Sequence, residues 1–312
     1  MKYNLANIKK AKFLLDRHEC VAIPTETVYG LAANAYSDRA VNKIYKLKKR
    51  PSNNPLIVHY FNLNDLKRDC ILNNDFLKLY KKFSPGPITY ILKLKKNSKI
   101  SKIVTNNKKN LAVRFPKHYI ARKLLKSLNY PLAAPSANIS SKLSPVCFQD
   151  VRDNFGNKLK LILDGGRCLV GLESTIISLF DNPRILRLGG LEVSKIKRIL
   201  KKNILTKLSS SKISSPGQMR VHYSPGIPIR LNAKKPKKYE AYLLLKKNKK
   251  FIKNVYILSK NGDLKEAAKN LYKTLRKIRK DKFKSIAVRK IQNSGLGKTI
   301  NDRLLRASKF NG

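Results

Sequence analysis

The stretch from Pro24 to Tyr60 constrains the fold of this chain more than any other part of the sequence. The apolar run just before it, residues 21–23, indicates a buried strand, and Pro24 ends that strand because proline has no N–H to donate to a sheet. Gly30 then permits a backbone turn that a side chain would resist. The residues between these two points include a polar cluster made of Thr25, Glu26, Thr27 and Tyr29.

A helix and a second strand complete this stretch. Apolar residues at helical spacing predict a helix over 40–49 that runs out at Pro51, and the apolar run 56–58 predicts a strand closed by His59. The loop between them displays cations and amides, namely Lys48, Lys49, Arg50, Asn53 and Asn54. Such groups at a strand–helix junction suit a phosphate-bearing ligand. A basic triplet in so basic a chain is also typical of a solvated helix end, so the residues alone leave both interpretations open.

This stretch resembles the signature of the YrdC/Sua5 family, the threonylcarbamoyl-AMP synthases that begin the t6A modification of tRNA. The resemblance rests on PTETVYGL at 24–31, on residues 48–56 and on His59. Later segments are similar too: PSAN at 135–138, Ser144-Pro145, 164–166, 171–177 and the segment around Arg187. The chain departs from the family in shape but loses no charged group, with Leu172 and Leu188 for the usual valine and proline, and 83–85 where a tryptophan often precedes the proline.

The resemblance implies an α/β fold with a YrdC-like twisted open mixed sheet and flanking helices over residues 1–203. A linker over 204–227 and a small Rossmann-like α/β domain over 228–312 would follow. A chain of 312 residues is long enough for two such domains, and the serine-rich segment 201–215 has the composition of a linker. Periodicity predicts further helices at 5–18, 64–82, 120–128, 192–200, 264–279 and 296–308, and strands at 88–94, 111–115, 160–164, 173–179, 184–188, 241–245, 255–259 and 285–291, with an apolar strand end in 131–138.

The resemblance also implies the site residues. The catalytic set is Lys48, Arg50, Ser136 and Asn138. The ATP-binding set is Arg50, Asn54, Asn110, Ser136, Ser144, Arg187, His222 and Tyr223. The threonine-binding set is Thr27, His59, Arg114, Ala134, Ser174 and Thr175. These residues include no Ser-His-Asp or Cys-His arrangement, so the implied chemistry is positioning and charge neutralisation.

Two of these residues have a structural interpretation as well as a ligand-binding one. Arg114 interrupts an apolar strand, and a buried guanidinium must have an anionic or hydrogen-bonded partner. The carboxylate of an amino acid is one such partner, and a structural ion pair with Glu26 or Glu173 is the other. A lone histidine such as His59 is more often structural than a ligand.

The implied reaction joins threonine, bicarbonate or CO2 and ATP, and releases pyrophosphate. Magnesium is expected to be carried on the phosphates, because few carboxylates are available to cage it. The expected onward partner is the threonylcarbamoyl-transferase machinery acting on tRNA. A carbamoyl-transfer enzyme of hydrogenase maturation is disfavoured, since the sequence has no zinc-finger cysteine pairs.

The formal net charge is +51, from 69 Lys and Arg against 18 Asp and Glu. This excess fits direct tRNA binding, even a non-catalytic RNA-binding protein on the same fold, but it also fits a genome-wide compositional bias because it is spread along the chain. The cysteines, Cys20, Cys70, Cys147 and Cys168, have neither disulfide nor zinc spacing. Without a signal-peptide pattern or a long apolar run, the expectation is a cytoplasmic protein that does not enter the membrane.

Two C-terminal motifs complete the interpretation. Residues 216–225, PGQMRVHYSP, are too distinctive for a bare spacer, and the resemblance implies a lid over the active site; an ordered, inert connector is the alternative. Residues 292–299 look like a phosphate-binding P-loop, but the first position is Gln292 and no later strand could supply a magnesium-binding Asp. The family resemblance instead makes this segment a helix of the second domain.

Overall fold

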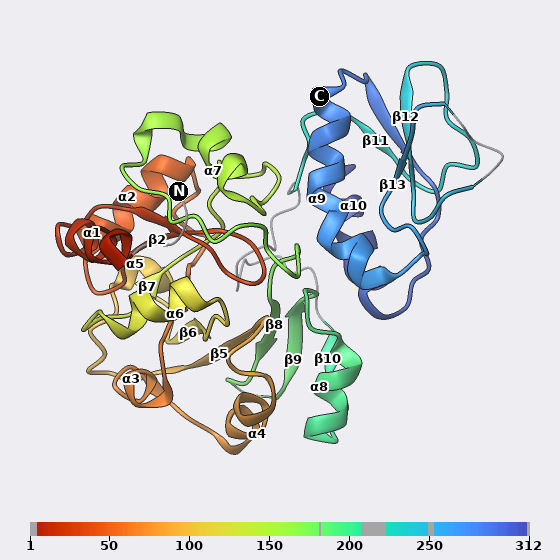
Figure 1. Cartoon of the computed structure of the whole chain (residues 1–312). Coiled ribbons are helices and arrows are strands. Elements are labelled where there is room, and N and C mark those ends of the chain that lie inside the picture. The colour runs from red at the N-terminus through yellow and green to blue at the C-terminus, as the bar shows by residue number, and fades with distance from the viewer. Residues whose placement is uncertain (1–4, 181, 207–222, 249–252, 311–312) are drawn as a thin grey trace.

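The computed structural model of this chain describes residues 5–180, 182–206, 223–248 and 253–310. The described chain forms two sheets, each with its own helices, and the two units lie side by side (Figure 1). The expected α/β architecture is therefore confirmed, with a mixed sheet first and a small parallel sheet second.

The larger sheet has ten strands in the order β1-β2-β7-β3-β6-β5-β8-β9-β10, with β4 paired to β5. Its strands are β1 (Val21–Ile23), β2 (Gly30–Asn34), β3 (Ile57–His59), β4 (Cys70–Ile71), β5 (Ile88–Leu94), β6 (Asn110–Arg114), β7 (Leu132–Ala133), β8 (Thr175–Ser178), β9 (Arg184–Arg187) and β10 (Leu205–Thr206). The pairs β3–β6, β5–β8 and β9–β10 are parallel and the remaining pairs are antiparallel.

Helices flank this sheet. They are α1 (Leu5–Asp16), α2 (Asp38–Lys48), α3 (Leu63–Lys67), α4 (Asn74–Phe83), α5 (Lys102–Thr105), α6 (Tyr119–Lys126), α7 (Phe148–Phe155), the 3-10 helix η1 (Gly156–Lys158) and α8 (Val193–Leu200). Helices α1 and α6 share a core that includes Ile8, Leu15 and Leu124. Helix α2 begins where the Ser37 side chain accepts a hydrogen bond from the Ala40 N–H, and it ends at Lys49, whose φ of 49° breaks the helix.

The pleat of the central strands sets the position of the site. Because side chains alternate between the faces of a strand, Ile57 and His59 of β3 share one face, as do Ala112 and Arg114 of β6. His59 pairs in register with Arg114, and Arg114 pairs with Thr89 of β5. The apolar members of this face form a small core, and the polar side chains gather where β3 and β6 end.

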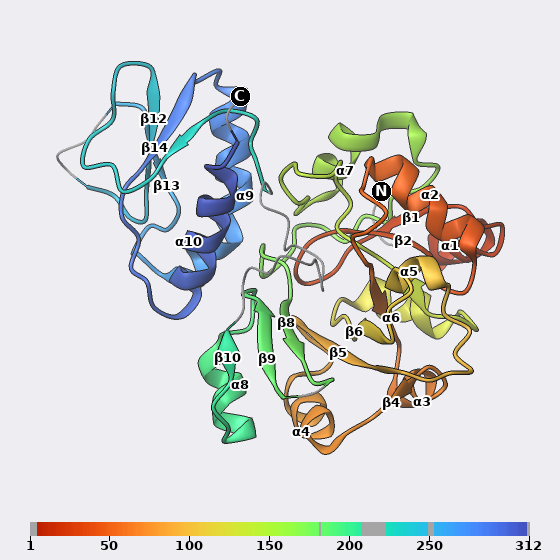
Figure 2. The same cartoon turned by 180° about the vertical axis from the view of Figure 1, so that it is seen from behind.

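The second unit is a parallel α/β sheet in the order β11-β14-β12-β13. Its strands are β11 (Ile229–Arg230), β12 (Glu240–Leu244), β13 (Val255–Ile257) and β14 (Ser285–Val288), and its helices are α9 (Leu264–Lys280) and α10 (Gly295–Ala307). Figures 1 and 2 show these two helices between the small sheet and the first unit. Helices α9 and α10 therefore supply the side chains that meet the larger sheet.

Three expectations about local structure were wrong. Residues 64–82 are not one helix, because Asp69 turns inward between α3 and α4 and accepts hydrogen bonds from the hydroxyls of Tyr36 and Tyr60, each at 2.9 Å. Residues 160–164 make only an isolated bridge, between Ile162 and Ala22. Gly30 begins strand β2, which pairs with β1, so the sequence interpretation missed a strand before α2.

Candidate active site

A pocket lies where β3 and β6 end, and β8, β9 and the segment after residue 222 close its other side. Its lining residues are Thr25, Val28, Tyr29, Gly30, Arg50, Ile57, His59, Arg114, Ala134, Pro135, Ser136, Glu173, Ser174, Arg187 and Tyr223. Eight of them are residues that the sequence predicted for the site: Arg50, His59, Arg114, Ala134, Ser136, Ser174, Arg187 and Tyr223. The pocket volume is about 40 Å³, room for only a few waters, so a nucleotide would enter only if part of the wall moved.

Three guanidinium groups face this pocket. Arg50 is oriented by the carbonyls of Asn54 and Pro55, which accept from its Nε at 3.1 Å and its Nη2 at 3.0 Å. Arg187 donates from Nε and Nη2 to the carbonyl of Ser174, at 3.1 and 2.9 Å. Burial lowers the pKa of Arg50 to about 10 and also lowers the pKa of Arg187, and both remain cations at neutral pH. The pocket is therefore built to receive anions.

The third guanidinium, Arg114, forms the structural ion pair with Glu26 that was one of the two interpretations of its sequence position. Its Nη2 donates to Oε1 of Glu26 at 2.7 Å, in an ion pair whose side chains are only 5% and 7% exposed. Its Nε is buried without a hydrogen-bond partner among the described residues. A buried N–H left unpaired is costly, so this atom marks a place where a ligand carboxylate would gain a strong contact.

His59 lies beside Arg114 and is 2% exposed. Burial, reinforced by the Arg114 charge, lowers the pKa of His59 well below its usual range, so the imidazole is neutral. Its Nδ1 has no hydrogen-bond partner among the described residues. A neutral ring with a free nitrogen can recognise a hydroxyl group.

Lys48 and Asn138 do not line the pocket but hold the loop that does. The buried Lys48 Nζ donates to the carbonyls of Ser136 and Asn138, at 2.6 and 2.5 Å. The Asn138 amide donates to the carbonyls of Ile139 and Lys142, at 2.8 and 2.9 Å. Burial, with Arg50 nearby, lowers the pKa of Lys48 well below its usual range. In this conformation Lys48 positions Ser136.

The other predicted residues lie away from the pocket lining. Thr27 shares a hydrogen bond of 2.8 Å with the hydroxyl of Thr25, and Thr175 donates to the carbonyl of Leu191 at 2.5 Å. Asn110, Asn54 and Ser144 lie outside the lining, although the buried Asn54 amide has no hydrogen-bond partner among the described residues. His222 is outside the described residues, as is most of the proposed lid.

The sequence interpretation missed Thr25 and Glu173 as lining residues. Thr25 stands in the polar cluster after the first strand, and its hydroxyl donates to the carbonyl of Val28 at 2.6 Å. Glu173 precedes Ser174, and it is one of only 18 acids in the chain. The sequence did contain a signal for Glu173, because an acidic residue next to an apolar strand is unusual in so basic a chain.

Other kinds of site find little support in the described chain. Among residues 5–180, 182–206, 223–248 and 253–310, no group of three or more His, Cys, Asp or Glu side chains could hold a metal, and all the cysteines are free. No helix in these ranges has the length and apolarity needed to cross a bilayer. The P-loop-like segment opens α10, but the Glu192 carboxylate lies so near Gly295 that a Cβ there would be 2.9 Å from Oε2, at the end where a phosphate would sit.

The family comparisons agree with this architecture. A family model described as "Telomere recombination" matches residues 14–189, and one described as "Threonylcarbamoyl-AMP synthase, C-terminal domain" matches residues 191–309. Threonylcarbamoyl-AMP synthases of Pyrococcus abyssi and Bacillus subtilis are each 34% identical, over 97% and 98% of this chain and 94% of each relative. The same enzyme of Schizosaccharomyces pombe is 40% identical over 68% of this chain and 60% of that protein.

Solved structures give the same result. The crystal structure of P. abyssi Sua5 complexed with L-threonine superposes with a TM-score of 0.90 at 31% identity, covering 99% of this chain and 96% of that one. Full-length HypF, at 22% identity and a TM-score of 0.53, shares the fold over 59% of this chain. Fold and site together define a two-domain α/β protein with an arginine-lined pocket. The chain belongs to the YrdC/Sua5 family, in the two-domain branch of threonylcarbamoyl-AMP synthases.

Proposed function

We propose that this chain condenses threonine, bicarbonate-derived CO2 and ATP into threonylcarbamoyl-adenylate and pyrophosphate. The observation that carries this proposal is the meeting of three arginines, Arg50, Arg114 and Arg187, with the neutral His59 in one pocket. Cations suit a triphosphate and a carboxylate, and the uncharged ring suits a hydroxyl. Threonine and ATP together present all three of these groups.

We assign the threonine side of the pocket to β3 and β6. The Nε–H of Arg114 would donate a hydrogen bond to the carboxylate of threonine, and His59 would hydrogen-bond its hydroxyl. Ala134 and Ser174 would shape this side, with Thr27 and Thr175 supporting the wall from behind. The nucleotide side would use Arg50, Ser136, Arg187 and Tyr223, with Asn54, Asn110, Ser144 and His222 completing it when ATP is bound.

The chemistry needs no nucleophile from the protein. The threonine amine adds to the carbon of CO2 and loses a proton, which gives a carbamate. A carbamate oxygen then bonds to the α-phosphorus of ATP as the bond from phosphorus to the pyrophosphate oxygen breaks. Arg50 and Arg187 would stabilise the charge that develops on the phosphates, and Lys48 and Asn138 would fix Ser136 beside them. Mg²⁺ would travel with ATP on its phosphates, because the described residues offer no carboxylate cluster for it.

We infer that residues 204–227 act as a lid between a catalytic domain, 1–203, and a C-terminal domain, 228–312. The described end of this segment supports that role. Tyr223 is 1% exposed and lines the pocket, and the Ser224 N–H donates to the carbonyl of Ser141 at 2.9 Å. A lid would exclude bulk water from a labile adenylate.

The product would pass to a threonylcarbamoyl transferase acting on tRNA, in the cytoplasm. The charge of +51 leaves direct tRNA contact open, and it is the one feature that favours the alternative of a non-catalytic RNA-binding protein. One assay separates the two functions. Pyrophosphate release should require ATP, threonine and bicarbonate together, and omission of any one should abolish it. An RNA-binding protein without this activity would release none under any combination.

A further inference from the structure

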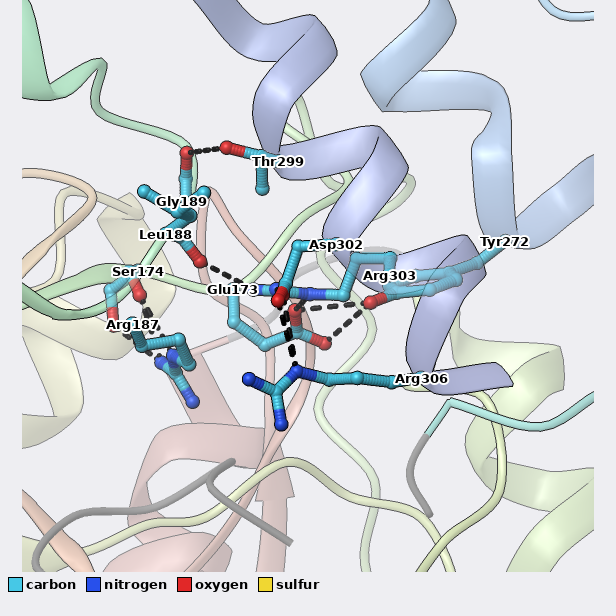
Figure 3. Close-up of polar contacts among 10 residues, drawn as sticks. All are labelled: Glu173, Ser174, Arg187, Leu188, Gly189, Tyr272, Thr299, Asp302, Arg303 and Arg306. Carbon is cyan, nitrogen blue, oxygen red and sulfur yellow. Dashed lines mark hydrogen bonds and ion pairs between the residues drawn. The ribbon is translucent and has the colours of Figure 1, made fainter. Parts of the chain in front are cut away.

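Glu173 and Arg303 form a buried ion pair between the two units of the chain (Figure 3). The Arg303 Nε donates to Oε2 of Glu173 at 2.9 Å, and the two side chains are 1% and 6% exposed. The Tyr272 hydroxyl of α9 approaches both oxygens of the same carboxylate, at 2.9 and 3.0 Å. Glu173 lines the candidate pocket, whereas Arg303 and Tyr272 belong to the C-terminal helices.

Arg303 contacts three separate parts of the pocket wall. Besides Glu173, its Nη2 donates to the carbonyl of Leu188 at 2.6 Å, directly after the pocket residue Arg187. Its guanidinium carbon also lies 4.5 Å from the ring centroid of Tyr223, in a cation–π contact. The Arg303 side chain therefore contacts the segment just before β8, the segment just after β9 and the described end of the linker.

Neighbouring contacts leave little freedom at this junction. The Thr299 hydroxyl of α10 donates to the carbonyl of Gly189 at 3.1 Å. A Cβ at Gly189 would come within 2.3 Å of the backbone at Ser174 and Thr175, so only glycine permits the two strands to approach this closely. The backbone that presents Arg187 to the pocket is thus fixed from α10 and from β8 together.

Glu173 is also electrostatically coupled to Arg187. Burial alone would raise the pKa of Glu173, but Arg303 first, and Arg187 second, hold it at about 2. The groups that face this carboxylate are Arg303 from α10, Tyr272 from α9, Arg187 from β9, the Ser144 side chain and Tyr223 from the linker end. Asp302 of α10 belongs to the same cluster and is paired with both Arg303 and Arg306. A carboxylate that lost Arg303 would have Arg187 as its remaining cationic neighbour among the groups that face it.

We propose that Arg303 is a positioning residue for the ATP side of the site, which keeps Glu173 from capturing Arg187 and so leaves Arg187 available to the phosphates of ATP. This proposal rests on the function proposed above. It gives the C-terminal unit a specific task, because without Arg303 an uncompensated buried carboxylate would neutralise a substrate-binding cation.

The test compares ATP binding by full-length wild type, Arg303→Gln, Glu173→Gln and the double variant, measured by calorimetry. Arg303→Gln should weaken ATP binding by roughly tenfold or more, which is about 1.4 kcal/mol or more. Removing the unpaired carboxylate as well should restore affinity, so the double variant should bind ATP within about threefold of Glu173→Gln. A double variant as weak as Arg303→Gln would overturn the proposal.

Rescue by the double variant is a result that a simple contact between the two units would not give. The double variant lacks the same Arg303 contacts as Arg303→Gln, so only the charge of Glu173 distinguishes the ATP affinities of the two proteins. Equal ATP affinities in Arg303→Gln and the double variant would show that Arg303 does not act through the charge of Glu173.

Asp150 of α7 provides the matched control. Its carboxylate lies 3.1 Å from the Nη1 of Arg276 of α9, so this ion pair joins the two units, and neither side chain lines the pocket. Asp150→Asn should lower the melting temperature but leave ATP affinity within about threefold of wild type, because the Arg276 Nη2 keeps its bonds to the carbonyls of Leu143 and Ser144. Equal losses of ATP affinity in Asp150→Asn and Arg303→Gln would show that Arg303 acts only as a contact between the units, and would overturn the proposal. ATP binding is measured without turnover, so a wild type that binds ATP but makes no adenylate would contradict the proposed function alone.

Discussion

His59 and Arg114 lie at paired positions of the parallel strands β3 and β6, and both side chains reach the same pocket. Burial, and after it the Arg114 charge, lowers the pKa of the neighbouring imidazole and keeps the ring neutral, because both disfavour a second positive group. In the function proposed above, this fixed cation would bind a carboxylate and the neutral ring beside it would bind a hydroxyl.

The first prediction is a strong preference for threonine over valine, its near-isostere without a hydroxyl. A site built to hydrogen-bond a hydroxyl leaves its own polar group unpaired when the analogue binds, so we expect kcat/KM to favour threonine by roughly 100-fold or more. Pyrophosphate release at matched ATP and bicarbonate measures this ratio. In His59→Leu the preference should shrink to a few-fold; equal rates with the two amino acids in wild type would refute the assignment.

Substitution of Arg50 should remove most of the activity. Arg50→Ala deletes a charge-assisted contact to the triphosphate in a partly dry site, a loss of roughly 2 to 4 kcal/mol, or about 30- to 1000-fold in kcat/KM. Arg39→Ala is the control, because Arg39 is an exposed arginine of the neighbouring helix α2 and does not line the pocket. A kcat/KM for ATP close to the wild-type value in Arg50→Ala would contradict its role.

Much of the fold could be predicted because its signals are local. The strand predicted at 88–94 is β5 as observed, and the helices predicted at 264–279 and 296–308 differ from α9 and α10 by one residue at each end at most. The single helix predicted at 64–82 failed because tertiary contacts draw Asp69 inward. Asn73, whose side chain caps α4 by accepting from the Phe76 N–H, was a start signal that the periodicity argument overlooked.

The site residues also divide into those that sequence motifs predict and those that depend on tertiary contacts. Arg50, Ser136 and His59 lie in motifs, so the family resemblance is enough to assign them to one site. The pairing of Arg114 with Glu26 is one of the alternatives that the sequence leaves open, since the chain contains few acids. The pairing of Glu173 with Arg303 joins residues 130 positions apart and depends on how two units dock, which no local pattern encodes.

Acid should destabilise the protein through Glu173. Its pKa is lowered from 4.5 to about 2, so the carboxylate contributes stability above its unfolded pKa, and this contribution is lost as the pH falls from about 4.5 toward 2. The lowering corresponds to about 3 kcal/mol. We therefore expect the free energy of unfolding, measured in urea, to decline over this window, and less steeply in Glu173→Gln. Identical slopes for the two proteins would contradict the assignment.

Protease cleavage within residues 207–222 should slow when ATP and threonine are both bound, if this segment closes over the pocket. Each ligand alone should protect less, because the lid would close fully over the complete substrate set. Timed digestion of the full-length chain, with fragments identified by mass, measures the rate. Cleavage near 249–252, a segment of the C-terminal unit, is the control and should not change. Unchanged cleavage at 207–222 with both ligands present would show that the segment only connects the two units.

The most direct test of the central claim follows the carbon of bicarbonate into the product. With ATP, threonine and ¹³C-labelled bicarbonate, the wild-type protein should release pyrophosphate and form an adenylate that carries one ¹³C atom. The labelled atom should be the carbamoyl carbon bonded to the nitrogen of threonine. An adenylate without the label, or no adenylate in a protein that binds both ATP and threonine, would contradict the account.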